Sequence, residues 1–84
     1  MNIIITPHAE KELRKLPKNI VEPILKKLHS IMENPLHFIE RLVGSPLWKL
    51  RIGDYRAILF IKTKEQEIHV VKIGHRKGMY KKGK

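Results

Sequence analysis

Three cations gather on one face of a hairpin that we predict from residues 48–59, WKLRIGDYRAIL. Two runs of alternating apolar and polar residues meet at Gly53-Asp54, and a Gly-Asp pair between such runs indicates a two-residue turn. Counting outward from the turn pairs Arg51 with Arg56. Residues paired across strands share a face, as do residues two apart on one strand, so Lys49 joins the two arginines. Opposed like charges destabilise a sheet, and we therefore interpret this cluster as a clamp for phosphate.

A second group of candidates follows the last predicted strand, in the segment GHRKGMY at residues 74–80. We expect His75, Arg76 and Tyr80 on a loop beside the sheet, and loops held by a rigid scaffold often carry site residues. Arginine offers a planar fork for phosphate, tyrosine a ring and a hydroxyl, and histidine a proton carrier near neutral pH. The plainer alternatives are that Tyr80 pins the tail and that His75 caps the strand end.

The residue types that other catalytic sites need are scarce. The chain has no cysteine, which excludes thiolate catalysis, disulfides and cysteine-ligated metal. Its 5 histidines have no spacing that assembles a metal site, and its serines lie in no nucleophile motif. Its 8 acidic residues suggest no carboxylate pair. We therefore expect no metal and no other cofactor.

Positive charge is concentrated in the C-terminal part of the chain. The 18 Lys and Arg residues exceed the 8 Asp and Glu residues and give a net charge of +10. Residues 1–48 carry a balance of +2 and residues 49–84 a balance of +8. This distribution favours a polyanionic partner, nucleic acid before membrane, although a solubilising tail is the plainer alternative. With no membrane-length apolar run, no signal-peptide pattern and no cysteine, we expect a cytoplasmic protein.

Capping residues, prolines and apolar periodicity divide the chain into elements. The N-terminal half is expected to hold a strand at residues 2–5, a helix from Pro7 to about Pro17, a helix from residue 19 or 20 to 33, and a connection over residues 34–46. The C-terminal half is expected to hold the hairpin, a polar turn at residues 63–66 and a strand at residues 67–73. Without a linker, residues 1–84 would form one domain.

This β-α-α-β-β-β order predicts an α+β fold with two layers, in which the two N-terminal helices pack on one face of a mainly antiparallel sheet. The hairpin residues expected to face the helices are Leu50, Ile52, Tyr55 and Ala57. The cation cluster would then lie on the opposite, solvent-exposed face, together with Ile58 and Phe60. An open face that mixes cations with apolar side chains suits a nucleic-acid strand.

The element order and the segments WKLRIGDYR and GHRKGMY resemble the RelE toxins of the RelE/ParE toxin–antitoxin superfamily. The resemblance covers essentially the whole chain. It implies the toxin of a type II toxin–antitoxin system, a ribosome-dependent, metal-independent endoribonuclease (mRNA interferase). Such a toxin cleaves mRNA in the ribosomal decoding site and inhibits translation. The implied partners are mRNA on the ribosome and a cognate RelB-like antitoxin that wraps around the toxin.

The residues that match the functional positions of the family are Lys49, Arg51, Arg56, Arg76 and Tyr80. Arg51 stands where a well-known branch has lysine, and Tyr80 follows Arg76 more closely than in that branch. The implied reaction is attack of an RNA 2′-hydroxyl on its adjacent phosphate, which gives a cyclic phosphate and a 5′-hydroxyl. The arginines would stabilise charge on the phosphoryl oxygens. Lys49 would be the base if neighbouring cations disfavour its charged form, Tyr80 would stack on a base or orient the attacking hydroxyl, and His75 would be a spare acid or base.

Two other functions remain open from the sequence. The ParE branch of the superfamily shares the fold but inhibits DNA gyrase, and a non-catalytic RNA-binding module would also account for the basic face. Arrest of protein synthesis would favour the RelE reading, and induction of a DNA-damage response would favour the ParE reading. Salt-dependent binding to any RNA, without cleavage on ribosomes, would favour the binding module.

Overall fold

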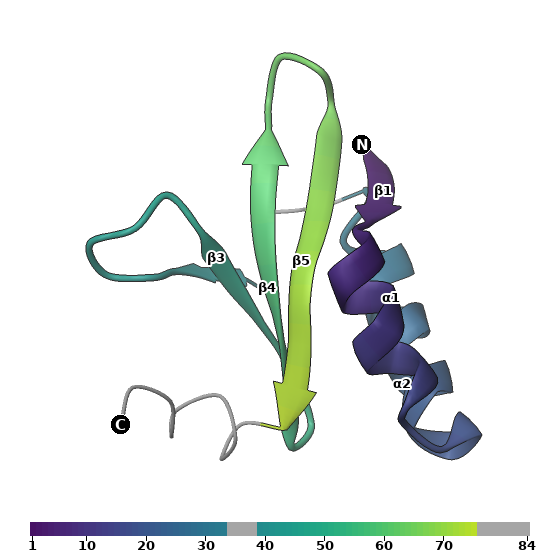
Figure 1. Ribbon diagram of the computed structural model, residues 1–84. Helices are drawn as coiled ribbons and strands as arrows, with labels where there is room; N and C mark the ends of the chain where they lie inside the picture. Colours follow the sequence, from purple (N-terminus) through teal and green to yellow (C-terminus); the bar gives the residue numbers. More distant parts are fainter. Residues whose placement is uncertain (34–38, 76–84) are drawn as a thin grey trace.

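The computed structural model of the chain describes residues 1–33 and 39–75. Its elements, in chain order, are β1 (Asn2–Ile5), α1 (Pro7–Arg14), α2 (Lys18–Ser30), β2 (Ile39–Arg41), β3 (Trp48–Ile52), β4 (Tyr55–Lys62) and β5 (Glu67–His75). The two helices lie side by side next to β1 and β5, on one face of a twisted sheet (Figure 1). The predicted α+β class, with two helices packed on one face of a mainly antiparallel sheet, is confirmed.

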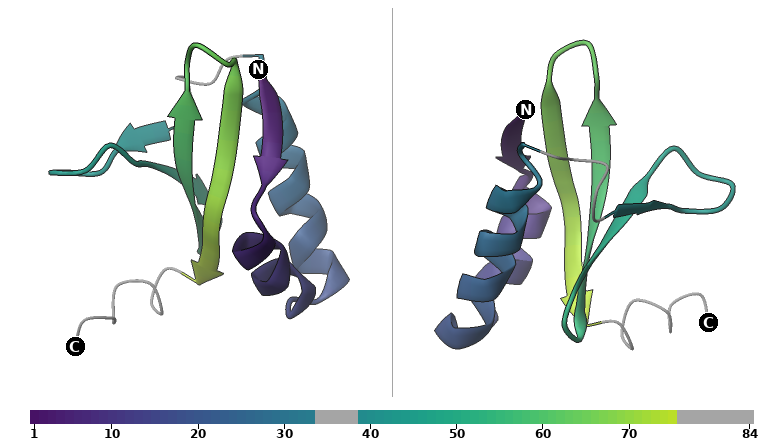
Figure 2. Two further views of the ribbon diagram at one scale, coloured as in Figure 1. Left: turned by 45° about the horizontal axis from the view of Figure 1, so that its top comes forward. Right: turned by 180° about the vertical axis from the view of Figure 1, so that it is seen from behind.

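The sheet has five strands in the order β1-β5-β4-β3-β2. Strand β1 pairs with β5 in parallel, and the other three pairs are antiparallel. The first strand of the chain therefore lies beside the last, and the β2–β3 hairpin forms the other edge. This hairpin projects away from the helices, as the two further views show (Figure 2).

Strand β2 corrects the predicted element order, because residues 34–46 are not simply a connection. Ile39–Arg41 pairs with Trp48–Leu50, which adds a fourth strand after the helices. Three residues are too few to show an alternating pattern, so this strand has no local signal. Its partner defines it, because Ile39 packs in the core opposite the fully buried Leu50.

The helices begin and end near their predicted capping residues. The Thr6 hydroxyl caps α1 by accepting a hydrogen bond from the Ala9 backbone N–H at 3.2 Å, and Pro7 takes the first helical position. Helix α1 ends at Arg14, before Pro17, and α2 ends at Ser30, three residues before the predicted position 33. No helix in the described part of the chain combines the length and apolarity needed to cross a membrane.

The core lies between the helices and the sheet face that they cover. It is built from buried aliphatic residues of both helices and of strands β2 to β5. Of the four hairpin residues predicted to face inward, Leu50 and Ala57 are fully buried, Ile52 is 9% exposed, and Tyr55 packs half-buried against the core. Because side chains alternate along a strand, the residues between them on β3 and β4 point to the opposite face of the sheet.

Candidate functional site

The β3–β4 hairpin has the register that the sequence predicts. Arg51 is the pairing partner of Arg56, and Lys49 is the partner of Ile58. Gly53 begins the turn with a φ of +60°, a positive value that glycine adopts more readily than other residues. Because Gly53 fixes the turn, it also fixes which residues of β3 and β4 share a face.

Three cations from two strands line one pocket on the sheet face opposite the helices. The pocket has a volume of about 280 Å³, and its lining residues are Glu40, Lys49, Arg51 and Arg56. The structure therefore brings together the three basic residues predicted from the hairpin. A concave site with two guanidinium groups and an ammonium group suits a phosphate-bearing ligand.

Glu40 is a member of this pocket that the sequence did not predict. Its Oε1 atom lies 3.4 Å from Lys49 Nζ, and the two side chains are 76% and 24% exposed. Glu40 lies on β2, which the sequence did not reveal, and no local pattern indicates that it pairs with Lys49. Surface ion pairs contribute about 0–1 kcal/mol, so an incoming phosphate can displace the Glu40 carboxylate from Lys49 at little cost.

Arg56 differs from its predicted surroundings. It shares a face with Arg51 as expected, but it is 5% exposed, whereas Arg51 is exposed. Arg56 lies on β4 in the centre of the sheet, between β3 and β5, and its partner on β5 is Gly74. The predicted solvent-exposed face is thus buried at this central strand, where Ile58 and Phe60 are also partly covered.

His75 is not on a loop, contrary to the prediction. It is the last residue of β5 and pairs with Tyr55. The two rings make an edge-to-face contact, with their centroids 5.3 Å apart and their planes at 74°. Because facing residues alternate along β5, His75 belongs to the sheet face opposite Arg56 and Gly74. The structure therefore separates His75 from the basic pocket, while Arg76 and Tyr80 lie outside the described residues.

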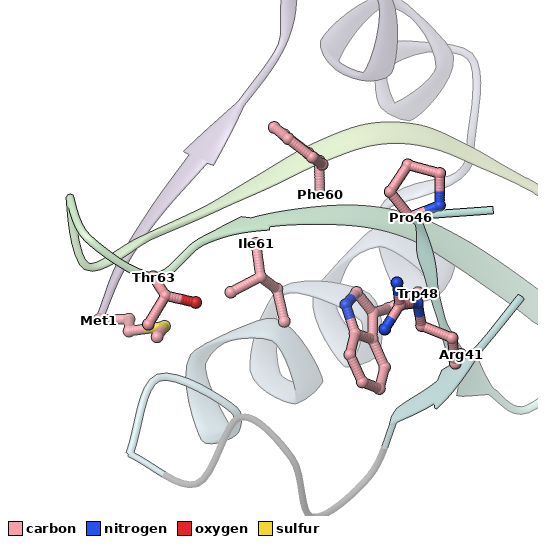
Figure 3. Close-up of a pocket in the computed structure, with 7 residues that line it drawn as sticks. All are labelled: Met1, Arg41, Pro46, Trp48, Phe60, Ile61 and Thr63. Carbon is pink, nitrogen blue, oxygen red and sulfur yellow. The ribbon is translucent and has the colours of Figure 1, made fainter.

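A second, larger pocket of about 500 Å³ lies beside Trp48 and Arg41 (Figure 3). Its lining residues are Met1, Arg41, Pro46, Trp48, Phe60, Ile61 and Thr63. The guanidinium carbon of Arg41 lies 5.2 Å from the centroid of the Trp48 ring, and Arg41 Nε donates a hydrogen bond to the Ser45 carbonyl at 3.0 Å. This cation–π pair stabilises the β2–β3 hairpin and lies apart from the three cations.

The described residues form no group suited to a metal ion. Within residues 1–33 and 39–75, no three His, Cys, Asp or Glu side chains gather where they could hold one. His8 and His69 each contact a neighbouring glutamate instead. His8 Nε2 lies 3.6 Å from Glu12 Oε2, and His69 Nε2 lies 2.9 Å from Glu67 Oε1.

Comparison with protein families gives one match that spans most of the chain. The model of a family described as "ParE toxin of type II toxin-antitoxin system, parDE" matches residues 3–80. No curated protein matches the chain in a sequence comparison.

Several solved toxin structures have a similar fold. RelE in the intact RelBE complex of E. coli is 28% identical with a TM-score of 0.77, and the match covers 88% of this chain and 94% of that chain. RelE in the archaeal RelE–RelB complex of Pyrococcus horikoshii OT3 is 27% identical, again with a TM-score of 0.77, and 89% and 93% are covered. A chain of the Mycobacterium tuberculosis RelBE2 complex has a TM-score of 0.81 at 22% identity, with 89% and 96% covered, and this likeness shows the fold.

Proposed function

The chain belongs to the ParE toxin family of type II toxin–antitoxin systems, within the RelE/ParE superfamily, and we propose on this premise that it is a ribosome-dependent mRNA endoribonuclease of the RelE kind. In this proposal it cuts mRNA in the ribosomal decoding site and so stops translation. The E. coli and Pyrococcus horikoshii relatives were solved as RelE–RelB complexes. We extend that partnership to this chain as a cognate RelB-like antitoxin.

The pocket of Lys49, Arg51 and Arg56 is the observation that carries the proposal. Register places the two arginines directly opposite each other on β3 and β4. Like charges in that position destabilise the free protein, and a bound phosphate removes the repulsion. The pocket therefore favours an RNA backbone over an uncharged ligand.

The proposed reaction is the attack of a 2′-oxygen on the adjacent phosphorus. The 2′-hydroxyl gives its proton to a water molecule as its oxygen bonds to phosphorus, the bond from phosphorus to the 5′-oxygen breaks, and the 5′-oxygen takes a proton from a second water molecule. The products are a cyclic phosphate and a 5′-hydroxyl. This chemistry needs cations near the phosphoryl oxygens, where one well-placed donor contributes about 3 kcal/mol to the transition state.

The three cations of the pocket are assigned different roles in this reaction according to their exposure. Arg51 is exposed at the pocket and is assigned to the phosphoryl oxygens. Arg56 supports the same charge from the buried side of the pocket. Lys49 is already in contact with a carboxylate, and we assign it to phosphate binding in place of the role of base that the resemblance implied. The predictions for Arg76 and Tyr80 stand unchanged, and we assign His75 no role in this reaction because it lies on the other face.

Few groups in the pocket carry protons easily, since arginine stays protonated at any physiological pH. An isolated enzyme with such a site would be slow. A ribosome that holds the mRNA in a reactive geometry supplies the missing orientation, which is worth several orders of magnitude in rate. The composition of the pocket thus supports dependence on the ribosome.

The first test is mRNA cleavage on programmed ribosomes by the wild-type protein and by Arg51→Ala. Arg51 is chosen because it is exposed, so its removal leaves the core intact. We expect cuts within the decoding-site codon, and a rate of cleavage about a hundredfold lower in the variant, which is the loss typical of one charge-stabilising donor. The 5′ ends of the fragments, mapped by primer extension, give the position of the cut.

The matched control is Lys64→Ala, which removes a cation from the turn between β4 and β5, at the opposite end of β4 from the β3–β4 turn (Figure 1). It should cleave at the wild-type rate. Wild-type protein that leaves mRNA intact on competent ribosomes would refute the proposal. Inhibition of DNA supercoiling by gyrase would then favour the function of the ParE branch.

A further inference from the structure

Helix α1 reaches across to β5 through one side chain. The Ile73 backbone N–H donates a hydrogen bond to Glu12 Oε1 at 2.6 Å, between residues 61 positions apart in the chain. The Glu12 side chain is 23% exposed, and its second oxygen lies 3.6 Å from His8 Nε2. The Ile73 residue itself is 2% exposed. A carboxylate on the solvent-facing edge of a helix thus accepts from a buried strand amide.

This contact occurs where β5 loses its outer neighbour. Strand β1 pairs with β5 only as far as Ile5 and Val70. Thr6 then closes that pairing, since its backbone N–H and its hydroxyl both donate to the Val70 carbonyl, at 3.1 and 3.0 Å. Beyond Val70, no strand within residues 1–33 and 39–75 covers the outer edge of β5, and α1 packs against β5. Glu12 provides the acceptor that a neighbouring strand would otherwise supply.

The end of β5 held in this way lies directly beside the basic pocket. Ile73 pairs with Ala57 on β4, and the next residue, Gly74, pairs with Arg56. Gly74 has no side chain, so no side chain of β5 stands beside Arg56 at this register position. The position of Arg56 in the pocket therefore depends on where the last residues of β5 lie.

We infer that Glu12 is a positioning residue for the pocket of Lys49, Arg51 and Arg56. Its carboxylate holds Ile73 from the outer side while β4 holds it from the inner side, and the Arg56–Gly74 pairing is fixed between them. The effect of Glu12 on cleavage rests on the proposed ribonuclease function. Its effect on β5 does not.

Two substitutions of Glu12 test the length of its side chain and its charge separately. Glu12→Gln loses the charge but keeps an oxygen at the same distance from the backbone. Glu12→Asp keeps the charge but is shorter by one methylene, so its oxygens no longer reach the Ile73 N–H. The control Glu10→Gln removes an exposed carboxylate of the same helix, one that lies 3.2 Å from Arg14.

Two measurements on the full chain test the inference. The first is hydrogen exchange of the Ile73 amide by NMR, which we expect to be about tenfold faster in Glu12→Asp and within about twofold of wild type in Glu12→Gln. The second is multiple-turnover cleavage of mRNA on programmed ribosomes, below the unfolding temperature of every variant. We expect kcat to fall about tenfold in Glu12→Asp with KM within about twofold, and both to be kept in Glu12→Gln and Glu10→Gln.

Any other result contradicts one part of the inference about Glu12. Loss of activity in Glu12→Gln with retention in Glu12→Asp would show that charge matters and reach does not. Faster Ile73 exchange with unchanged kcat would show a contact that only stabilises the fold. Wild-type protein without cleavage would refute the ribonuclease and its dependence on Glu12, while the exchange of Ile73 would still decide whether Glu12 holds β5.

Discussion

Arg51 and Arg56 are register partners with different surroundings. This difference decides how clearly a substitution of each tests the binding of phosphate. Arg51 is on β3 and is exposed, whereas Arg56 is on the central strand β4 and is 5% exposed. Removing a buried arginine disturbs packing as well as charge, since its long stem covers apolar surface. Loss of activity in an Arg56 variant therefore needs a stability measurement beside it, and Arg51 gives the cleaner test of the phosphate clamp.

Glu40 makes a second prediction at the residue scale. Its carboxylate lies in the pocket that should bind phosphate, 3.4 Å from Lys49 Nζ. Glu40→Gln removes this competing charge, and a charge 4 Å away in a water-like medium is worth about 1 kcal/mol. We expect binding of a non-cleavable RNA oligonucleotide to tighten about fivefold, as measured by fluorescence anisotropy.

The free energy of unfolding should change by less than about 0.5 kcal/mol in Glu40→Gln, because the Glu40 side chain is 76% exposed. Glu65→Gln serves as the control, since it removes an exposed carboxylate from the turn between β4 and β5. It carries the same change in net charge, so equal tightening in both variants would mean that net charge, rather than the pocket, governs the affinity.

At the scale of elements, the β3–β4 turn sets the site through the backbone of Gly53. Its φ of +60° is costly for a β-branched residue, and an added Cβ would meet nothing within 4 Å. The cost of Gly53→Val is therefore conformational, and we expect the free energy of unfolding to fall by about 1–2 kcal/mol in urea denaturation. Gly53→Asn is the matched variant, because asparagine tolerates this conformation, and it should lose about half as much or less.

An equal loss in both Gly53 variants would contradict this account, because it would mean that the side chain rather than the backbone conformation is at fault. A loss of ribosomal cleavage in Gly53→Val that exceeds the loss in Gly53→Asn would further show that the turn keeps the two arginines in register.

Elements with local signals could be predicted from the sequence, and elements made by distant partners could not. The hairpin and its register followed from the alternation around Gly53-Asp54, and α1 followed from Thr6-Pro7. Strand β2 and Glu40 were missed because Ile39–Arg41 becomes a strand only by pairing with β3. The pairing of His75 with Tyr55 similarly depends on β4, since the segment after Ile73 has the composition of a turn.

The candidate site shows the same limit. Alternation in the hairpin correctly places three cations on one face, because it depends only on the pleat. It does not reveal how deeply each side chain is covered, because that depends on the position of the strand within the sheet. Arg56 was therefore assigned to the right face and to the wrong exposure.

For the whole molecule, the net charge of +10 and the basic pocket act over different distances. The overall charge attracts any polyanion and is screened within about 10 Å at moderate salt. In the proposed function, the pocket would add direct contacts between cations and phosphates, each of which would release counterions on binding of RNA. A titration with salt separates the two contributions, because it counts the contacts.

We expect the affinity for a 2′-O-methyl RNA oligonucleotide to fall with salt, so that log Kd rises linearly with the logarithm of the salt concentration. Arg51→Ala should lower the slope by about 0.7, which is the value for one lost phosphate contact with a single strand. Lys64→Ala removes the same charge from the turn between β4 and β5 and should leave the slope within about 0.2 of wild type. Parallel lines for wild type and Arg51→Ala would mean that Arg51 does not touch a phosphate, even if the affinity falls. A reduced slope in Arg51→Ala together with an unchanged slope in Lys64→Ala would place the bound RNA strand on the sheet face that carries the basic pocket.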